Sequence, residues 1–441
     1  MRFLENIIIE EPELKGNRLS SKVSVPNSFE KYLKEKELFI EYNTEINADE
    51  DILNIPLTAT ILPLAWLTGV NVNVGKIDRT FKESMDSLQK EFTKTYPLIK
   101  FSTEIIADKL IENKIGKIDP EKRTGLLFSG GVDSFYSLIN NLQKKPKLII
   151  LWGSDNFPYP EHSDHWEKII SIYQDFAERK KLELNVLKTN ISQILDGLKI
   201  THKFHKELYN GGVRSALQHS LVLIPATAPL SIGRFNKIII AASGSPPYNT
   251  LKPRAARPWF DEKIIWADLK VETHGCIPRK DKIFSLAEYM KEDNITLRVC
   301  LSSKLVDGLI NDCSCPKCYL QIAHLIIAGA DPNECGFKVE ESTFARMKAF
   351  LISKKSLRLN QKWYEIQKIA RNGVDFEVPG SREFFKWLQD FDLRSGEINW
   401  FYTDLYMSLP YVLAKNLDRV YYRMGINIHE EPYIREEIQT N

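Results

Sequence analysis

Between residues 125 and 242, short apolar runs alternate with helical stretches in a regular order, and this pattern constrains the fold more than any other feature. The expected strands are 125–128, 147–152, 184–188 and 237–242, and the expected helices begin near 134 and cover 161–181 and 214–223. Strands that are apolar along almost their whole length are typical of a parallel sheet covered by helices on both faces. We therefore expect an α/β domain whose ligand binds beyond the carboxyl ends of the strands.

The chain on either side of this alternation has a different character, and 441 residues exceed one ordinary hydrophobic core. Residues 1–115 combine strand-like runs with an amphipathic helical stretch at 81–96, which predicts an α+β N-terminal domain. The central α/β domain is expected to cover residues 116–340. Residues 341–441 are helical in pattern and rich in aromatic side chains, so we expect a mostly helical C-terminal domain.

The charge balance and the apolar segments limit the compartment and the partners. Lys and Arg number 60 against 58 Asp and Glu, so the net charge of +2 gives no general attraction to nucleic acid or to an anionic membrane. The N-terminus lacks the basic start and apolar run of a secretory signal. The most apolar window, 55–74, contains two prolines and two asparagines, which favours burial in a core over a membrane span. We expect a cytoplasmic protein without a membrane partner.

A glycine-rich loop follows the first expected strand and opens the next helix. Its residues are Ser129, Gly130, Gly131, Val132, Asp133 and Ser134. Two glycines let a ligand approach the main chain, and the amides of the loop and of the first helical turn form a concave donor site. The helix dipole favours an anion there, and two serines add hydroxyl donors. The pattern predicts a phosphate site; the alternative is a tight turn in which Ser and Asp cap the helix.

Four of the six cysteines lie close together in the sequence. They are Cys300, Cys313, Cys315 and Cys318. Thiolates held this close repel one another unless a cation binds them, and four sulfurs suit tetrahedral Zn²⁺. Clustering without a signal sequence favours a metal site over disulfides. The alternative is a group of buried free thiols. Cys276, Cys335 and His274 are not expected to be ligands.

The loop at 129–134 resembles the pyrophosphate-binding loop S-G-G-x-D-S of the N-type ATP pyrophosphatases, the PP-loop family. It is not a Walker A loop, because the lysine of that motif is missing. The resemblance implies a Rossmann-like fold of the HUP type and a loop that holds the pyrophosphate leaving ATP, with Mg²⁺ neutralising the phosphates. By matching position, it implies catalytic roles for Ser129, Asp133 and Ser134.

Residues 313–332 are similar to the tail of the 7-cyano-7-deazaguanine synthase family, QueC. Cys300, Cys315 and Cys318 match, as do the pairs 328–329 and 331–332. The family spacing would place a cysteine at 312, where this chain has Asp312, and Cys313 is displaced by one residue. The similarity covers roughly residues 120–340, so the terminal segments have no counterpart in the compact family enzyme.

This resemblance implies ATP-dependent adenylation of 7-carboxy-7-deazaguanine followed by amide formation. Because QueC-like proteins with extra domains, the QatC type among them, occur in antiviral defence operons, we hypothesise that the amine belongs to a protein partner docked on the terminal domains. Three alternatives stay open. The first is a 7-cyano-7-deazaguanine synthase that uses ammonia in queuosine-type biosynthesis. The second is another PP-loop enzyme, such as a tRNA thiolase or an amidotransferase-type ligase. The third is a non-catalytic ATP-binding subunit.

Further candidate binding residues follow the later strands. Asp155 lies just beyond the second expected strand, and Arg214 lies in a turn where the family carries an arginine. Candidates for the acidic substrate, in or beside the proline-rich segment 243–258, are Arg254, Arg257, Trp259 and Lys263. Arg pairs with carboxylates and Trp stacks on flat heterocycles. The alternative is a solvated loop with scattered positive charge.

Overall fold

A computed structural model describes residues 5–119, 123–154, 159–160, 163–209, 211–244, 246, 254–290, 292–300, 305–353, 357–371 and 378–393. The chain forms two compact units. Unit 1 comprises Met1–Ser129, Asp133–Ser245 and Pro253–Cys276. Unit 2 comprises Gly130–Val132, Pro246–Lys252 and Ile277–Asn441. The glycine-rich loop therefore contributes residues to both units.

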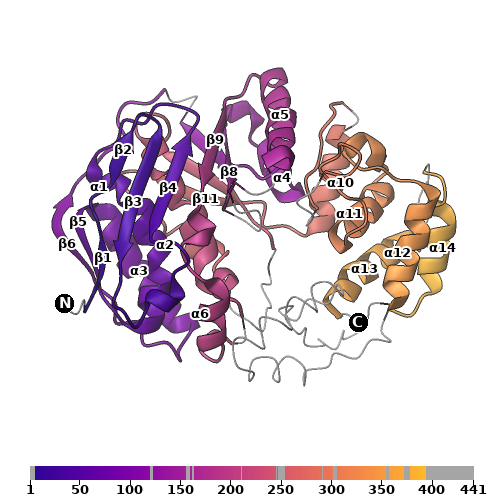
Figure 1. Ribbon diagram of the computed structural model, residues 1–441. Helices are drawn as coiled ribbons and strands as arrows, with labels where there is room; N and C mark the ends of the chain where they lie inside the picture. Colours follow the sequence, from indigo (N-terminus) through magenta and orange to yellow (C-terminus); the bar gives the residue numbers. More distant parts are fainter. Residues whose placement is uncertain are drawn as a thin grey trace. The chain divides into compact units, whose positions relative to one another are not determined.

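Unit 1 is built on one mixed sheet, which has eleven strands within the described residues (Figure 1). The strands are β1 (Ile7–Ile9), β2 (Glu13–Lys15), β3 (Arg18–Ser24), β4 (Glu37–Tyr42), β5 (Val72–Asp78), β6 (Ile105–Ile111), β7 (Thr124–Leu127), β8 (Lys147–Trp152), β9 (Leu184–Thr189), β10 (Lys237–Ala241) and β11 (Lys270–His274). Their order is β11-β10-β7-β8-β9-β4-β3-β1-β5-β6, and β2 pairs with β3.

Five neighbouring strands, β11, β10, β7, β8 and β9, pair in parallel. The central strand is β7, in which Leu126 pairs with Leu148 on one side and with Ile239 on the other. The chain adds β8 and β9 on one side of β7 and then β10 and β11 on the other, so the strand order reverses at β7. All four strands expected from the sequence are present, within one residue at most of their ends, and the α/β class is confirmed.

Helices connect these strands, and helical structure is present at each of the three places where the sequence predicted it, near 134, within 161–181 and at 214–223. They include α4 (Val132–Ile139), α5 (Ser163–Arg179), α6 (Gly197–Lys203), a π-helix (Arg214–Gln218), α7 (His219–Leu223), α8 (Ala228–Ser231) and α9 (Pro258–Asp261). In α4 and α5 the apolar side chains recur at helical spacing, and Phe135 and Phe176 meet edge to face at 5.4 Å between ring centroids. This packing buries the side of α5 that faces α4.

The expected boundary near residue 115 does not separate compact units. Strand β4, from the expected N-terminal domain, pairs antiparallel with β9, with Ile40 opposite Thr189. The backbone amide of Phe39 also donates to Asn190 Oδ1 at 2.9 Å. The N-terminal strands and the parallel strands therefore form one continuous sheet and belong to one unit. Alternating apolar residues identify a strand, but they do not show which distant strand it pairs with.

The apolar window is a core helix of unit 1. Helix α2 (Ile55–Thr68) covers most of it, α1 (Glu50–Leu53) directly precedes it, and α3 (Arg79–Thr95) follows β5. Among the described residues, the stretch Glu50–Thr68 alone is long and apolar enough to cross a membrane, but 94% of its apolar window is buried inside the protein. The expectation of burial in a core is confirmed.

Unit 2 is helical in the part that the structure describes. Its helices are α10 (Arg279–Met290), α11 (Pro316–Ile327), α12 (Glu341–Ser353), α13 (Leu357–Ala370) and α14 (Ser381–Asp390). Helix α11 packs against α10 and α13, and α14 packs against α12 and α13. Trp363 and Phe384 meet edge to face at 6.1 Å between ring centroids. Helices are therefore present at 341–353, 357–370 and 381–390, as expected, whereas residues 354–356, 372–377 and 394–441 lie outside the described part.

Candidate functional site

The glycine-rich loop begins where β7 ends. The amide of Phe128 still donates to the carbonyl of Ile149 at 2.8 Å, which continues the pairing with β8 by one residue. The next turn then leaves the sheet, and Gly130 has φ +73°. That left-handed conformation strains residues with a Cβ, which explains a glycine at this position. Helix α4 starts two residues later, so the loop joins the carboxyl end of a strand to a helix N-terminus.

The polar side chains of the loop are placed by α4. Ser134 is buried on its first turn, and its Oγ lies 3.2 Å from Oγ of Ser129. Asp133 precedes Ser134 on the same turn and is half-buried. The first amides of a helix have no acceptor within the helix, and the macrodipole makes this end electropositive. Two hydroxyls and a helix N-terminus at one strand end make a chemically suitable place for an anion.

Arg214 reaches the carboxyl end of the neighbouring strand. It opens the π-helix, and its Nη2 donates to the carbonyl of Ser154 at 2.7 Å, two residues beyond the end of β8. π-Helical turns often occur at functional sites. Arg214 therefore lies at the carboxyl ends of the parallel strands, the same edge of the sheet at which the glycine-rich loop follows β7. The other candidate expected after a strand, Asp155, lies outside the described residues.

The four candidates for an acidic substrate do not form one group. The amide of Ala255 donates to the carbonyl of Ser215 at 2.8 Å, which ties the segment holding Arg254 and Arg257 to the π-helix. Lys263 is directed elsewhere, since its Nζ lies 3.9 Å from Glu91 Oε1 on α3. Trp259 is 45% exposed. The segment 254–257 is therefore associated with Arg214, whereas Lys263 contributes to the contact with α3.

Four donor atoms gather in unit 2 at the cysteine cluster. They belong to Cys300, Asp312, Cys315 and Cys318, and all lie within 4.8 Å of one another. Sγ of Cys300 lies 4.0 Å from Sγ of Cys315. Two sulfurs bound at tetrahedral Zn²⁺ would be about 3.8 Å apart, given a Zn–S distance of about 2.3 Å. This group can hold a metal ion such as zinc.

The backbone around the cluster favours ligation. The amide of Asp312 points at Cys300 Sγ at 3.3 Å, and that of Cys318 points at Cys315 Sγ at 3.5 Å. The amides of Ser314 and Cys315 donate to Asp312 Oδ1 at 2.9 and 3.0 Å, which fixes the carboxylate. Such contacts orient metal ligands.

Crowding of the sulfurs opposes thiolate formation in the protein alone. The side-chain hydrogen bond with Cys315 raises the pKa of Cys300 to about 12. The pKa of Cys318 is raised as well, first by its hydrogen bonds with Cys300 and Cys315. A bound dication would reverse this effect by stabilising the thiolates.

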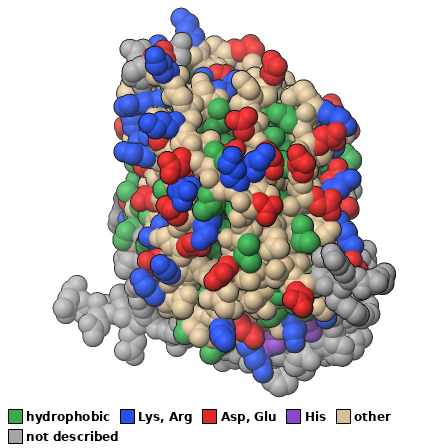
Figure 2. Space-filling view, turned by 90° about the vertical axis from the view of Figure 1, so that its left-hand side faces the viewer, with side chains coloured by type: hydrophobic (Ala, Val, Ile, Leu, Met, Phe, Trp, Pro, Cys, Tyr) green, Lys and Arg blue, Asp and Glu red, His purple; other side chains and the backbone are tan. Residues whose placement is uncertain are grey.

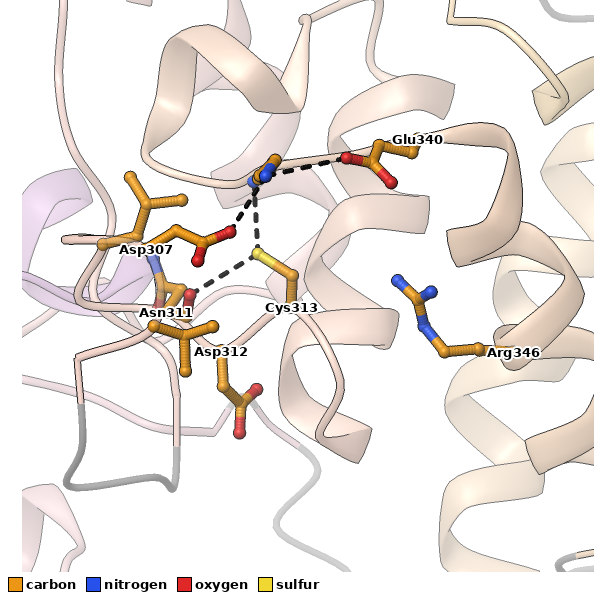
Figure 3. A pocket seen from close by; sticks show the side chains of 9 residues that line it. Asp307, Asn311, Asp312, Cys313, Glu340 and Arg346 are labelled. Atoms are coloured by element: carbon orange, nitrogen blue, oxygen red, sulfur yellow. Dashed lines mark hydrogen bonds and ion pairs between the residues drawn. The ribbon is translucent and has the colours of Figure 1, made fainter.

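Asp312, rather than Cys313, supplies the fourth donor of this group, which therefore differs from the ligand set Cys300, Cys313, Cys315 and Cys318 expected from the sequence. Cys313 has φ +52°, and its Sγ contacts the carbonyl of Asn311 at 3.5 Å and the amide of Lys338 at 3.2 Å. It lines a pocket of about 160 Å³, toward which Arg346 points from α12 (Figure 3). The side chains of the consecutive residues 312 and 313 diverge there.

Sequence reasoning missed one buried acid close to the π-helix. Asp261 ends α9, is 3% exposed and accepts a hydrogen bond from Ser220 on α7. Burial raises the pKa of Asp261 to about 7. A carboxylate in a loop-like segment gives no sign of burial in the sequence, because its burial depends on the helix that packs over it.

No protein-family model matches the chain, and neither a curated protein nor a solved structure matches it. The class that can be stated from the fold and the site is an α/β protein with a Cys₃Asp group suited to a metal ion.

Proposed function

We propose that this chain is an enzyme that binds ATP at the loop Ser129–Ser134, transfers AMP to a carboxylate and releases pyrophosphate. One observation carries the proposal. The sequence Ser-Gly-Gly-Val-Asp-Ser connects β7 to α4 at the strand where the sheet order reverses. In open parallel sheets of the doubly wound, Rossmann-like kind, ligands bind beyond the carboxyl ends of the strands at such a reversal.

The chemistry assigned to the loop is to hold two linked phosphates. A carboxylate oxygen attacks the α-phosphorus of ATP, the bond to the β-phosphate oxygen breaks, and pyrophosphate leaves with the electron pair. The amides of Gly130 and Gly131, with the hydroxyls of Ser129 and Ser134, would stabilise the leaving charge. Mg²⁺, when bound, would neutralise the phosphates, and Asp133 is the loop side chain suited to hold it.

The acyl adenylate is then a substrate for an amine. The amine nitrogen attacks the acyl carbon, AMP leaves, and an amide forms with loss of a proton. The resemblance to QueC supports 7-carboxy-7-deazaguanine as the acid. The segments outside that resemblance, 1–115 and 341–441, support an acceptor larger than ammonia, namely a protein partner in antiviral defence. Synthesis of the nitrile from ammonia is the simpler alternative.

A tRNA substrate is less well supported. On the face shown in Figure 2, acidic and basic side chains are interspersed over the described residues. This distribution agrees with the net charge of +2 and lacks the one-sign field that attracts a polyanion. A small acid and a protein amine therefore remain the proposed substrates.

The test is release of pyrophosphate from ATP and Mg²⁺ by the full chain. We expect release to depend on added 7-carboxy-7-deazaguanine and to fall at least about 100-fold in Asp133→Ala. Intact mass spectrometry of coexpressed neighbouring proteins would identify an acceptor that gains the deazaguanine amide. Pyrophosphate release that is unchanged in Asp133→Ala would refute the role of the loop. Tight ATP binding without turnover for any acid or amine would favour a non-catalytic subunit.

A further inference from the structure

One buried side chain in unit 2 makes four hydrogen bonds to the backbone beside the metal group, the donor set Cys300, Asp312, Cys315 and Cys318. Asn311 is 1% exposed. Its Oδ1 accepts from the amides of Val299 and Cys300, each at 3.1 Å. Its Nδ2 donates to the carbonyls of Leu297 at 2.7 Å and Gly336 at 2.9 Å. An asparagine that makes all these bonds fixes the segment 297–300 relative to residue 336.

This segment connects the metal group to the glycine-rich loop. Cys300, at one end, is a member of the metal group. Two residues earlier, the amide of Arg298 donates to the carbonyl of Gly130 at 2.7 Å. All of these residues belong to unit 2. Asn311 is therefore next to the metal group in two places: it directly precedes Asp312 in the sequence, and its side chain binds the amide of Cys300.

The bond to Gly130 has a consequence for the loop. A peptide unit is planar and trans, so its carbonyl and the following amide point in opposite directions. Because the carbonyl of Gly130 is held by Arg298, the amide of Gly131 is held on the opposite side of that peptide. Glycines on both sides of a peptide allow it to turn over at little steric cost. The hydrogen bond from the Arg298 amide therefore selects one of the two orientations of the Gly130–Gly131 peptide. This orientation sets the direction of the Gly131 amide, which the phosphate loop needs as a donor.

We propose that Asn311 is a positioning residue that couples the metal site to the phosphate loop through the Arg298 amide. Metal binding at Cys300 and Asp312 orders the segment 297–300, and this segment orients the Gly130–Gly131 peptide for a phosphate. The ligand named here, ATP, rests on the proposed function, whereas the coupling between metal and loop does not.

The experiment compares zinc-loaded and chelator-treated full-length protein by hydrogen–deuterium exchange and by titration with ATP and with inorganic pyrophosphate. We expect removal of zinc to increase exchange at the amides of 130–133 and to weaken binding of both ligands about three- to tenfold, the effect of one lost hydrogen bond. Asn311→Asp keeps the acceptor for two amides but loses both donations, so it should produce the same changes with zinc still bound.

Asn333→Ala is the matched control, because it removes another side-chain acceptor of a backbone amide in unit 2: the amide of Val339 donates to Asn333 Oδ1 at 2.8 Å. We expect it to leave ligand binding and loop exchange unchanged. Unaltered loop exchange after zinc removal, or in Asn311→Asp, would overturn the coupling. If the loop loses protection on zinc removal but the wild type binds neither ATP nor pyrophosphate, the coupling stands and the proposed function fails.

Discussion

Ser220 donates a hydrogen bond to the carboxyl group of Asp261, and the two side chains are only 2% and 3% exposed. The pair joins α7 to α9 and so connects the π-helix region to the segment that carries Arg254 and Arg257. Burial is the largest cause that raises the pKa of Asp261 from 3.8 to about 7. The ionised form is therefore disfavoured in the folded protein, which makes the stability dependent on pH.

Asp261→Asn should stabilise the protein at alkaline pH. Between about pH 4 and pH 7 the unfolded chain has released the Asp261 proton while the folded protein retains it. The unfolded state then binds fewer protons, so the free energy of unfolding falls as pH rises. A difference of about three pKa units corresponds to about 4 kcal/mol at pH 8, as an upper value. Urea unfolding at pH 5 and pH 8 would measure it.

The substitution keeps an acceptor for Ser220, so we expect a gain of roughly 2–4 kcal/mol at pH 8 and a smaller change at pH 5. Asp86→Asn is the control, because Asp86 is half-exposed beside Lys82. It should change the stability by less than about 1 kcal/mol at both values. An equal effect of Asp261→Asn at the two pH values would contradict the raised pKa.

Gly153→Ala should disrupt the contact between the carboxyl ends of β8 and β9. A Cβ at position 153 would lie 1.7 Å from the carbonyl oxygen of Thr189, and the residue has φ +96°. Backbone would have to move, so we expect a loss above about 3 kcal/mol or failure to fold. Gly16→Ala has a similar positive φ of +61° but open space around it. It should cost only about 1–2 kcal/mol in thermal or denaturant unfolding.

Cys313→Ser should retain the metal, whereas Asp312→Ala should lose affinity for it. The reason is that Asp312, and not Cys313, lies with Cys300, Cys315 and Cys318. We expect about 10- to 100-fold weaker zinc binding for Asp312→Ala in a chelator competition, and little change for Cys313→Ser. The opposite result would restore the four-cysteine site that the sequence suggested.

Ser134→Ala should lower kcat/KM for pyrophosphate release by about 10- to 100-fold, because it removes one of two hydroxyls that lie 3.2 Å apart at the loop. Its effect on stability should stay near 1 kcal/mol, the size of one hydrogen bond. Ser163→Ala, at the exposed start of α5, provides the control and should leave kcat/KM unchanged. Equal kinetics for the two variants would argue against a phosphate at Ser134.

Much of unit 1 could be predicted because its signals are local. The strands β7, β8, β9 and β10 are short apolar runs, and their burial on both faces is visible in composition alone. The loop at 129–134 could be placed between a strand and a helix for the same reason. Its ATP chemistry stays a prediction, since no observation of the fold tests it.

The pairings between distant segments could not be predicted. Strand β4 joins β9 across almost 150 residues, and the hydrophobic pattern of either strand would allow other partners. The metal group illustrates the same limit at short range. Cysteine spacing suggested Cys313, but a left-handed turn at that residue directs its thiol to Lys338 and leaves Asp312 with the sulfurs.

The amino-acid sequence alone determined the alternation of strands and helices, the buried character of α2 and the position of the glycine-rich loop. Each of these depends on neighbours within a few residues. Only the tertiary structure decided that the N-terminal strands extend the same sheet, that Asp261 is buried, and that Arg298 meets Gly130. These contacts join residues far apart in the chain, and their formation depends on the packing of the whole unit rather than on any local preference.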